Sequence, residues 1–156
     1  FRKNKSSRFG ISERRQEVRM KKLVVDASGC LKWVFKEENS DRARLLLTQQ
    51  GKNEVLLLVP ALWEYEIVNG FASAMLRKKI SFLQARKFLK LVLEANLEII
   101  SMSGLLEKCL ENAKKYQISA YDSAYVTLAR ENGLILVSAD DRLVEKVGDK
   151  KLAVSL

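Results

Sequence analysis

The sequence predicts a doubly wound α/β/α sandwich, in which helices cover both faces of a parallel β-sheet. Five short apolar runs alternate along the chain with longer amphipathic stretches, and such an alternation of strand and helix is typical of α/β folds. The apolar runs also lack strict in-out alternation, as expected of strands that are buried on both faces. At 156 residues the chain is long enough for one domain with a substantial core.

The expected elements follow in order from Leu23. Strands are predicted at Leu23–Asp26, Leu56–Val59, Leu97–Ile100, Leu134–Ser138 and Leu152–Ser155. Helices are predicted at about 29–37, 41–50, 61–79, 81–95, 103–115, 119–131 and 141–147. Pro60 follows the second strand and suits the first position of the helix expected from Ala61. Gly51, Gly133 and Gly148 mark turns, and none belongs to a GxGxxG or Walker loop, so a nucleotide cofactor is not indicated.

The residue types present exclude several kinds of active site. The sequence has no histidine, which removes Ser-His-Asp triads, imidazole general bases and HExxH zinc sites. Cys30 and Cys109 have no CxxC partner, so we expect two buried thiols rather than a zinc site. A disulfide between them is the alternative for a hyperthermophilic source. No membrane-spanning stretch or signal peptide is recognised, so a cytoplasmic protein is expected.

Positive charge is concentrated in the first twenty residues. The formal net charge is +9, of which residues 1–20 contribute +5 through seven basic and two acidic side chains. The remaining 21 basic and 17 acidic side chains give only +4. We therefore divide the chain into a basic extension at 1–20 and one domain at 21–156. The extension is interpreted as disordered or non-native sequence before a natural start at Met20, with an RNA-contacting arm as the alternative.

Acidic side chains stand where apolar strands end. Asp26 closes the run Leu23–Val25, and Asp140 and Asp141 follow the strand that ends at Ser138. In open α/β sheets the carboxyl ends of the strands border the ligand crevice, so we expect these acids to share a site. The natural occupant of such a site is a cation.

The helix expected from Ala61 offers two further carboxylates. Glu64 and Glu66 lie roughly 200° apart around the helix axis, so only one of them faces the sheet edge. Glu66 shares a polar stripe with Asn69 and Ser73, whereas Glu64 falls away from it. We therefore predict that Glu66 takes part in the chemistry and that Glu64 is a surface or flanking residue.

Three of the acids also have a purely structural interpretation. Ser119 and Asp122 fit a capping box, although the helix face around Asp122 is apolar and makes an unpaired carboxylate costly to bury. Asp140 fits the N-cap of the next helix, with Asp141 well placed for the helix dipole. The structural interpretation is weaker for Asp26, which caps a helix only if one begins near Gly29.

Four sequence blocks occur in a specific order and spacing. They are Val25-Asp26-Ala27-Ser28 with Leu31-Lys32-Trp33, then Pro60-Ala61-Leu62 leading to Glu66-Ile67-Val68-Asn69, then Ser119-Ala120-Tyr121-Asp122-Ser123-Ala124-Tyr125, then Val137-Ser138-Ala139-Asp140-Asp141-Arg142-Leu143. Together they resemble the PIN-domain ribonucleases, and most closely the VapC toxins of toxin–antitoxin pairs. The resemblance covers the chain from Lys21 onward, and the first twenty residues have no counterpart.

The resemblance implies a five-stranded parallel sheet of order 3-2-1-4-5 and a metal-dependent endoribonuclease. In the implied mechanism, water activated by Mg²⁺ or Mn²⁺ attacks an RNA phosphodiester. Because four carboxylates in one pocket repel each other, a hard divalent ion suits them. The residues that match the family's acidic quartet are Asp26, Glu66, Asp122 and Asp140. Ser28, Asn69 and Ser138 match supporting polar positions, and Asp141 either assists or only caps.

The resemblance also implies three partners, which are RNA, a second copy of the chain and a small antitoxin. Core packing is the first interpretation of each single residue in a further apolar set, and the set as a whole is a candidate surface for the two proteins: Leu45, Leu46, Phe71, Met75, Phe82 and Phe88. Basic side chains are candidates to guide RNA, with plain surface charge as the alternative: Arg77, Lys78, Lys79, Arg86, Lys87 and Lys90. Two other functions stay open, namely a PIN nuclease of RNA maturation or decay without an antitoxin, and a noncatalytic PIN-like binding module.

Overall fold

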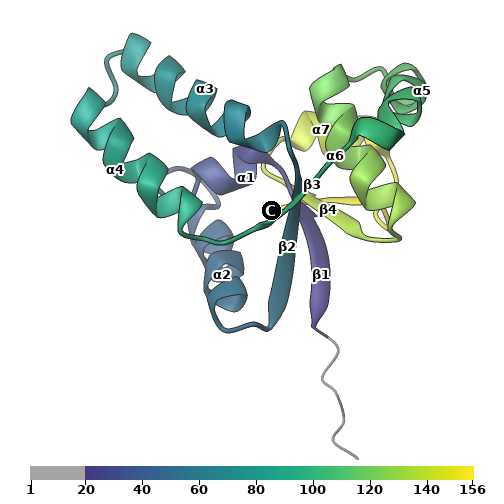
Figure 1. Cartoon of the computed structure of the whole chain (residues 1–156), viewed down its shortest axis with the longest axis horizontal. Coiled ribbons are helices and arrows are strands. Elements are labelled where there is room, and N and C mark those ends of the chain that lie inside the picture. The colour runs from purple at the N-terminus through teal and green to yellow at the C-terminus, as the bar shows by residue number, and fades with distance from the viewer. Residues whose placement is uncertain (1–19) are drawn as a thin grey trace, which may run out of the picture.

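The computed structural model describes residues 20–156, which form a five-stranded sheet with helices on both faces (Figure 1). The strands are β1 (Lys21–Val25), β2 (Val55–Pro60), β3 (Glu98–Ile100), β4 (Ile135–Ser138) and β5 (Ala153–Ser155). All neighbours pair in parallel, in the order β3-β2-β1-β4-β5. The predicted fold class and sheet order are confirmed, and each strand lies within one or two residues of its predicted bounds. The predicted extension at 1–20 lies outside the described residues, apart from Met20.

The central strands owe their apolar sequence to helices on both of their faces. Val24, Val25, Leu57 and Val59 are completely buried. On one side of the sheet lie α2 (Ser40–Gly51), α3 (Trp63–Leu76) and α4 (Phe82–Leu93), with α3 and α4 forming a hairpin (Figure 1). On the other side lie α5 (Leu106–Tyr116), which follows a 3₁₀ turn at Ser103–Leu105, and α6 (Ala120–Glu131). Burial on both faces explains why these strands show no alternation of polar and apolar residues.

Two short helices connect strand ends to the rest of the fold. They are α1 (Ala27–Leu31), directly after β1, and α7 (Asp141–Val147), after β4. The helix predicted at 29–37 is wrong in extent, because α1 is only five residues long and the chain then turns. The Ser40 hydroxyl holds this turn, since it accepts from the backbone N–H of Glu37 at 2.7 Å and donates to the carbonyl of Phe35 at 2.9 Å.

Pro60 ends β2 and does not start α3, which corrects the predicted helix start. The backbone N–H of Ala61 still donates to the Ile100 carbonyl at 2.9 Å, so the chain remains paired with β3 beyond the proline. Helix α3 begins at Trp63. A proline is tolerated at a strand end, where its missing N–H is not needed for the sheet.

The core lies between the sheet and the helices, and it contains both cysteines. Cys30 and Cys109 are buried and free, in agreement with their interpretation as thiols. Helix α6 is the most deeply buried helix, with every residue from Ser123 to Ala129 inside the fold. Within residues 20–156, no helix combines the length and the apolar character that a membrane span needs.

Candidate active site

Asp26 lies at the carboxyl end of the central strand β1, and its carboxylate is only 6 % exposed. One oxygen accepts from the Ser28 hydroxyl at 2.7 Å and from the Gly29 backbone N–H at 2.9 Å, and the other accepts from the Ser138 hydroxyl. The bond from Gly29 makes Asp26 the N-cap of α1. Burial raises the pKa of Asp26 above its ordinary value, the three hydrogen bonds oppose that rise, and the nearby Asp140 adds to it. The carboxylate is therefore rigidly held but insufficiently stabilised as an anion.

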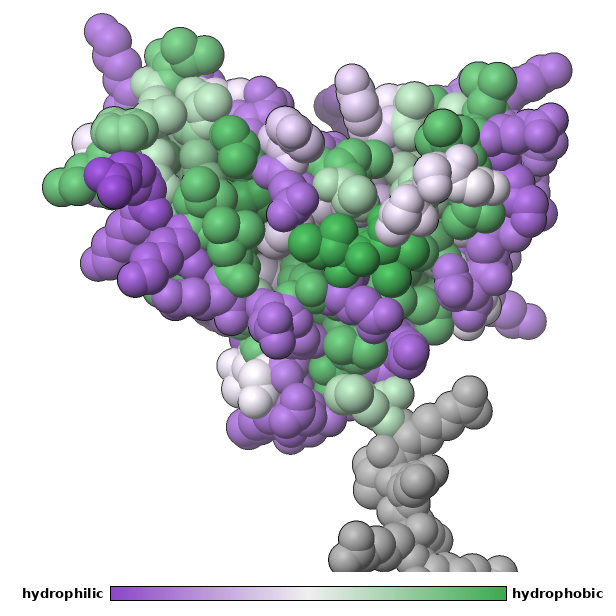
Figure 2. Space-filling model, viewed as in Figure 1, coloured by the Kyte–Doolittle hydropathy of each residue, from purple (hydrophilic) through white to green (hydrophobic). Residues whose placement is uncertain are grey.

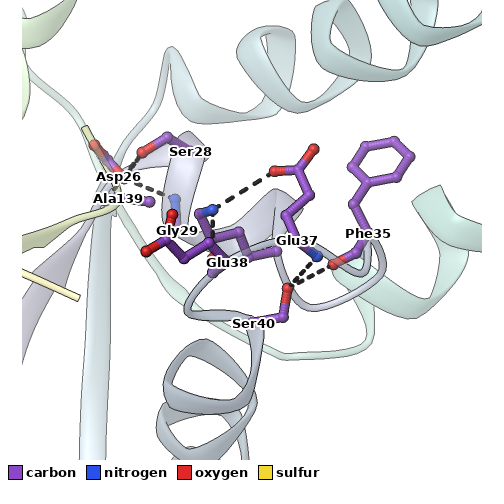
Figure 3. Close-up of polar contacts among 9 residues, drawn as sticks. Asp26, Ser28, Gly29, Phe35, Glu37, Glu38, Ser40 and Ala139 are labelled. Atoms are coloured by element: carbon purple, nitrogen blue, oxygen red, sulfur yellow. Dashed lines mark hydrogen bonds and ion pairs between the residues drawn. The ribbon is translucent and has the colours of Figure 1, made fainter. Parts of the chain in front are cut away.

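The end of β4 is joined to the end of β1 by polar contacts. The Ser28 hydroxyl accepts from the Ala139 backbone N–H at 3.2 Å (Figure 3). The Ser138 hydroxyl accepts from the Asp140 backbone N–H at 2.9 Å. Each serine therefore bridges Asp26 to the segment after β4. This arrangement follows from the parallel pairing of β1 with β4, which puts both carboxyl ends at one edge of the sheet.

Asp140 is exposed at that edge and is the N-cap of α7. Its Oδ1 accepts from the backbone N–H groups of Arg142 at 2.9 Å and Leu143 at 3.2 Å. Asp141 turns toward β5, where its carboxylate accepts from the Ser155 hydroxyl at 2.6 Å. Of these two acids, Asp140 is the one whose charge raises the pKa of Asp26.

Glu66 comes from the first turn of α3 and points toward α6, where the Tyr125 hydroxyl donates to its Oε2. Partial burial raises the pKa of Glu66, the bond from Tyr125 opposes the rise, and the charges of Asp26 and Asp122 add to it. Burial and the Glu66 charge also raise the pKa of Tyr125, so its hydroxyl remains a donor. Glu64 is exposed, as the helical phase predicted.

Asp122 lies in the first turn of α6. Its backbone N–H donates to the Ser119 hydroxyl at 3.0 Å, and this hydroxyl donates to the Asp122 carboxylate at 2.8 Å. Ser119 is therefore the N-cap, as predicted, while the Asp122 side chain contacts the hydroxyl of Ser119. The influence of Asp122 on Glu66 places it in the same group of acids.

None of the four acids has a basic partner to neutralise its charge, since within residues 20–156 no lysine or arginine forms an ion pair with any of them. In the same part of the chain, no three acidic or thiol side chains are close enough to hold a metal ion as they stand. The donor chemistry nevertheless fits Mg²⁺ or Mn²⁺, which bind carboxylate oxygens, keep several waters and need only one or two carboxylates as direct ligands. The raised pKa values of Asp26 and Glu66 mean that their charged forms are poorly stabilised, and a divalent ion would stabilise them.

The polar residues around the acids differ in their contacts. Ser28 and Ser138 bind Asp26, whereas Asn69 is exposed on α3. Tyr125 is a site residue that the sequence analysis missed, because its ring belongs to the apolar face of α6. The signal that points to it is its position one turn after Asp122, on the same helix face.

The chain is similar to known proteins in sequence and in fold. Residues 23–150 match the model of the PIN domain family. Ribonuclease VapC3 of Pyrobaculum aerophilum is 31 % identical over 127 residues, which cover 80 % of this chain and 94 % of the relative. Ribonuclease VapC9 of Mycobacterium tuberculosis is 31 % identical over 121 residues, covering 78 % of this chain and 87 % of the relative. The crystal structure of PAE2754 from Pyrobaculum aerophilum has the same fold, with a TM-score of 0.66 and 23 % identity over 87 % of this chain and 90 % of that one.

Proposed function

The chain belongs to the PIN domain family, and we propose that it is a metal-dependent endoribonuclease of the VapC type, the toxin of a toxin–antitoxin pair. One observation carries the proposal beyond the names of its relatives. Asp26 and Asp140 follow adjacent parallel strands and are bridged through the Ser138 hydroxyl, and within residues 20–156 none of the four acids is paired with a basic side chain. Such a group favours a divalent cation, and a phosphodiester is the substrate on which this chemistry acts.

Each acid has a function that its surroundings suit. Asp26 and Asp140, at the ends of adjacent strands, are the proposed metal ligands, while Glu66 and Asp122 bind the metal or orient its waters. When bound, Mg²⁺ or Mn²⁺ supplies an activated water and stabilises charge on the phosphate and the leaving oxygen. Ser28 and Ser138 fix the orientation of the Asp26 carboxylate. The Tyr125 hydroxyl does the same for Glu66.

Cleavage of single-stranded RNA in Mg²⁺ or Mn²⁺ tests the proposed activity. Loss of a group that only supports a metal ligand lowers activity roughly 10- to 100-fold. Because Asp26 is proposed as a metal ligand itself, Asp26→Asn is expected to lower kcat by more than about 100-fold. Circular dichroism on the same sample checks that the fold persists. Equal cleavage by the wild type and by Asp26→Asn would show that the site is assigned wrongly.

Helix α3 offers a matched pair of substitutions for the same assay. Glu66→Gln removes the charge beside Asp26 and Asp122, and it is expected to reduce cleavage strongly. Glu64→Gln makes the same chemical change on the exposed side of the same helical turn, and it is expected to retain wild-type activity. Similar losses in both variants would mean that a general charge effect, and not the site, governs cleavage.

Exposed apolar side chains support the proposal of an antitoxin partner and of a second copy of the chain. Figure 2 shows apolar residues over the region of the α3–α4 hairpin. Of the predicted surface residues, Leu45 and Phe82 are 58 % and 68 % exposed, and Leu46, Met75 and Phe88 are partly buried against the core. Phe71 is 3 % exposed, which agrees with its interpretation as a core residue and removes it from the candidate surface. Further large apolar side chains stand out on the hairpin: Tyr65, Val68, Leu76, Leu83, Leu91 and Leu93.

Sedimentation at micromolar concentration tests the proposed dimer. A dimer is expected, because an apolar surface of this extent is uncommon on a monomer. A sedimentation coefficient that stays at the monomer value over the accessible concentration range would contradict it. The proposed site of action is the cytoplasm, where RNA and a newly made antitoxin are both present.

A further inference from the structure

A pocket of about 300 Å³ lies between α1 and α3 and opens beside the acidic group. From α3 it is lined by Gly70, Ala74 and Arg77, which are one helical turn apart and so follow one face of the helix. Ser28 and Ala139 also line it. Ser28 belongs to both sites, because it lines this pocket and its hydroxyl binds the Asp26 carboxylate at 2.7 Å (Figure 3).

Three basic side chains and one carboxylate line this pocket. Lys32 comes from the turn after α1 and has a side chain only 14 % exposed, with its Nζ 2.7 Å from the Glu38 carbonyl and 3.6 Å from the Glu37 carboxylate. Arg77 and Lys79 are exposed, and within residues 20–156 neither forms an ion pair. The pocket therefore carries an excess of positive charge, in contrast to the acidic group beside it.

The end of α3 explains how Arg77 and Lys79 reach the same pocket. Lys78 adopts a left-handed conformation with φ of 56°, and this residue ends the helix. The backbone N–H of Lys78 donates to the Met75 carbonyl at 2.8 Å, and that of Lys79 donates to the Ala74 carbonyl at 2.9 Å. This closed turn is a common helix C-terminus, and it directs the residues on either side of Lys78 into the pocket.

We propose that this pocket binds a backbone phosphate of the RNA substrate, on the same strand as the phosphodiester that is cleaved, through Lys32, Arg77 and Lys79. The inference rests on the proposed ribonuclease function. The acidic group repels RNA, so a cationic site nearby is needed to hold the strand. Glu66 and Arg77, eleven residues apart on α3, are separated by about 16 Å along the helix axis, a distance that a short single strand can span.

The shape of the pocket suits a nucleotide better than a bare ion. Its volume corresponds to about ten water molecules, which leaves room for a phosphate together with part of a ribose. Leu31, Phe35 and Ala74 give it apolar walls between the cations. Cations that follow the backbone, combined with apolar or aromatic surface for sugar and base, are the usual features of a groove for single-stranded nucleic acid.

The basic residues of α4 are not part of this site. Arg86 lies over the Phe82 ring, with 5.9 Å from its guanidinium carbon to the ring centroid, and Lys90 lies 3.9 Å from Glu94. Arg86, Lys87 and Lys90 line shallow apolar depressions on α4 and do not line the pocket beside Asp26. Of the basic residues that the sequence suggested, only Arg77 and Lys79 are therefore assigned to the phosphate.

The test measures binding of a fluorescent single-stranded RNA to the full chain in EDTA, over a series of salt concentrations. Each lost phosphate contact on a single strand lowers the slope of log K against log salt by about 0.7. Arg77→Gln and Lys79→Gln are expected to weaken binding several-fold and to reduce the slope by that amount. Lys36→Gln is the matched control, because Lys36 is exposed between Phe35 and Glu37 but does not line the pocket. It is expected to keep the wild-type slope.

Cleavage kinetics in Mn²⁺ complete the test. The two pocket variants are expected to raise KM several-fold and to leave kcat unchanged, since neither side chain touches the acids. Equal slopes and KM values in all three variants would overturn the pocket while leaving the ribonuclease function intact. Pocket variants that bind RNA normally but lose affinity for an acidic protein partner would show that a protein occupies it. Failure of the wild type to bind or cleave RNA would overturn the ribonuclease function itself, and the pocket proposal with it.

Discussion

The Asp26 side chain has a structural function in the fold in addition to the chemical function proposed for it. Its carboxylate caps α1 through the Gly29 N–H, and the hydroxyls of Ser28 and Ser138 occupy further acceptor positions. The same combination applies to Asp140, because it caps α7 and is proposed as a metal ligand. Capping fixes the orientation of each carboxylate before a metal binds, which lowers the cost of assembling the site.

Tyr125 gives a residue-level prediction about the pH profile of cleavage. Its hydroxyl donates to Glu66 and opposes the rise in the pKa of that carboxyl, so Tyr125→Phe is expected to raise the pKa of Glu66 further. Less Glu66 is then ionised at a given pH, and the acidic limb of the kcat/KM profile moves to higher pH. Tyr121→Phe, on the exposed side of the same helix, is the control and is expected to leave the profile unchanged. An unshifted acidic limb in Tyr125→Phe would contradict the assigned function of Glu66.

The positions of the acids were largely predictable from the sequence, whereas their contacts were not. Asp26 and Asp140 follow apolar runs, and parallel strands end at one edge of a sheet, so their proximity follows from topology. The helical phase separates Glu66 from Glu64. The bond between Tyr125 and Glu66 joins residues 59 positions apart, and no local pattern contains it. The catalytic functions of these residues remain predictions.

At the level of elements, the close approach of α1 to α3 positions the Ser28 side of the site. Gly70 makes this approach feasible, because a Cβ at this position would lie 2.6 Å from Leu31 Cδ1. The same two helices form the walls of the proposed phosphate pocket. A glycine within a helix therefore has a packing function here, despite its low helix propensity.

Gly70→Ala is expected to destabilise the protein by about 1 kcal/mol. Overpacking costs about 1–3 kcal/mol, and the better helix propensity of alanine recovers about 0.5–1 kcal/mol of it. Urea denaturation measures the change in the free energy of unfolding. In a Leu31→Ala background the clash is absent, so the same substitution is expected to be neutral or stabilising. Gly51→Ala, where a Cβ meets nothing within 4 Å, is a second control, and a loss equal to that of Gly70→Ala would argue against the clash.

The element boundaries that the sequence did not predict depend on specific hydrogen bonds. The predicted helix at 29–37 stops at Leu31, and the turn that follows is held by Ser40. Pro60 belongs to β2 because the edge strand β3 continues to pair with the chain at Ala61. In both cases the local sequence permits a helix. Side-chain bonds within the turn hold the chain after the first helix, and a backbone bond to β3 precedes the start of the second.

At the scale of the whole molecule, folding brings together carboxylates that repel each other. The ordinary pKa values are 3.8 for Asp26 and 4.5 for Glu66, and both are raised in the folded protein. Below these ordinary values, both carboxyls are protonated in the folded and the unfolded chain. As the pH rises toward the raised values, the unfolded chain releases protons that the folded protein retains. The contribution of these two groups to the free energy of unfolding therefore falls with rising pH, and stays low above the raised values.

Divalent metal is expected to reverse this loss of stability. In EDTA, the contribution of Asp26 and Glu66 makes the protein less stable near pH 7 than near pH 4, and Mn²⁺ is expected to raise Tm near pH 7 and to have little effect near pH 4. An ion that binds only the folded protein stabilises it by about 2.7 kcal/mol at 100 times its Kd. Glu66→Gln is expected to reduce both the dependence on pH and the response to Mn²⁺, and Glu64→Gln to keep both. Differential scanning calorimetry measures Tm of the wild type and both variants at each pH, in EDTA and in Mn²⁺. A response to Mn²⁺ that is the same at both pH values, or in both variants, would show that the ion binds elsewhere.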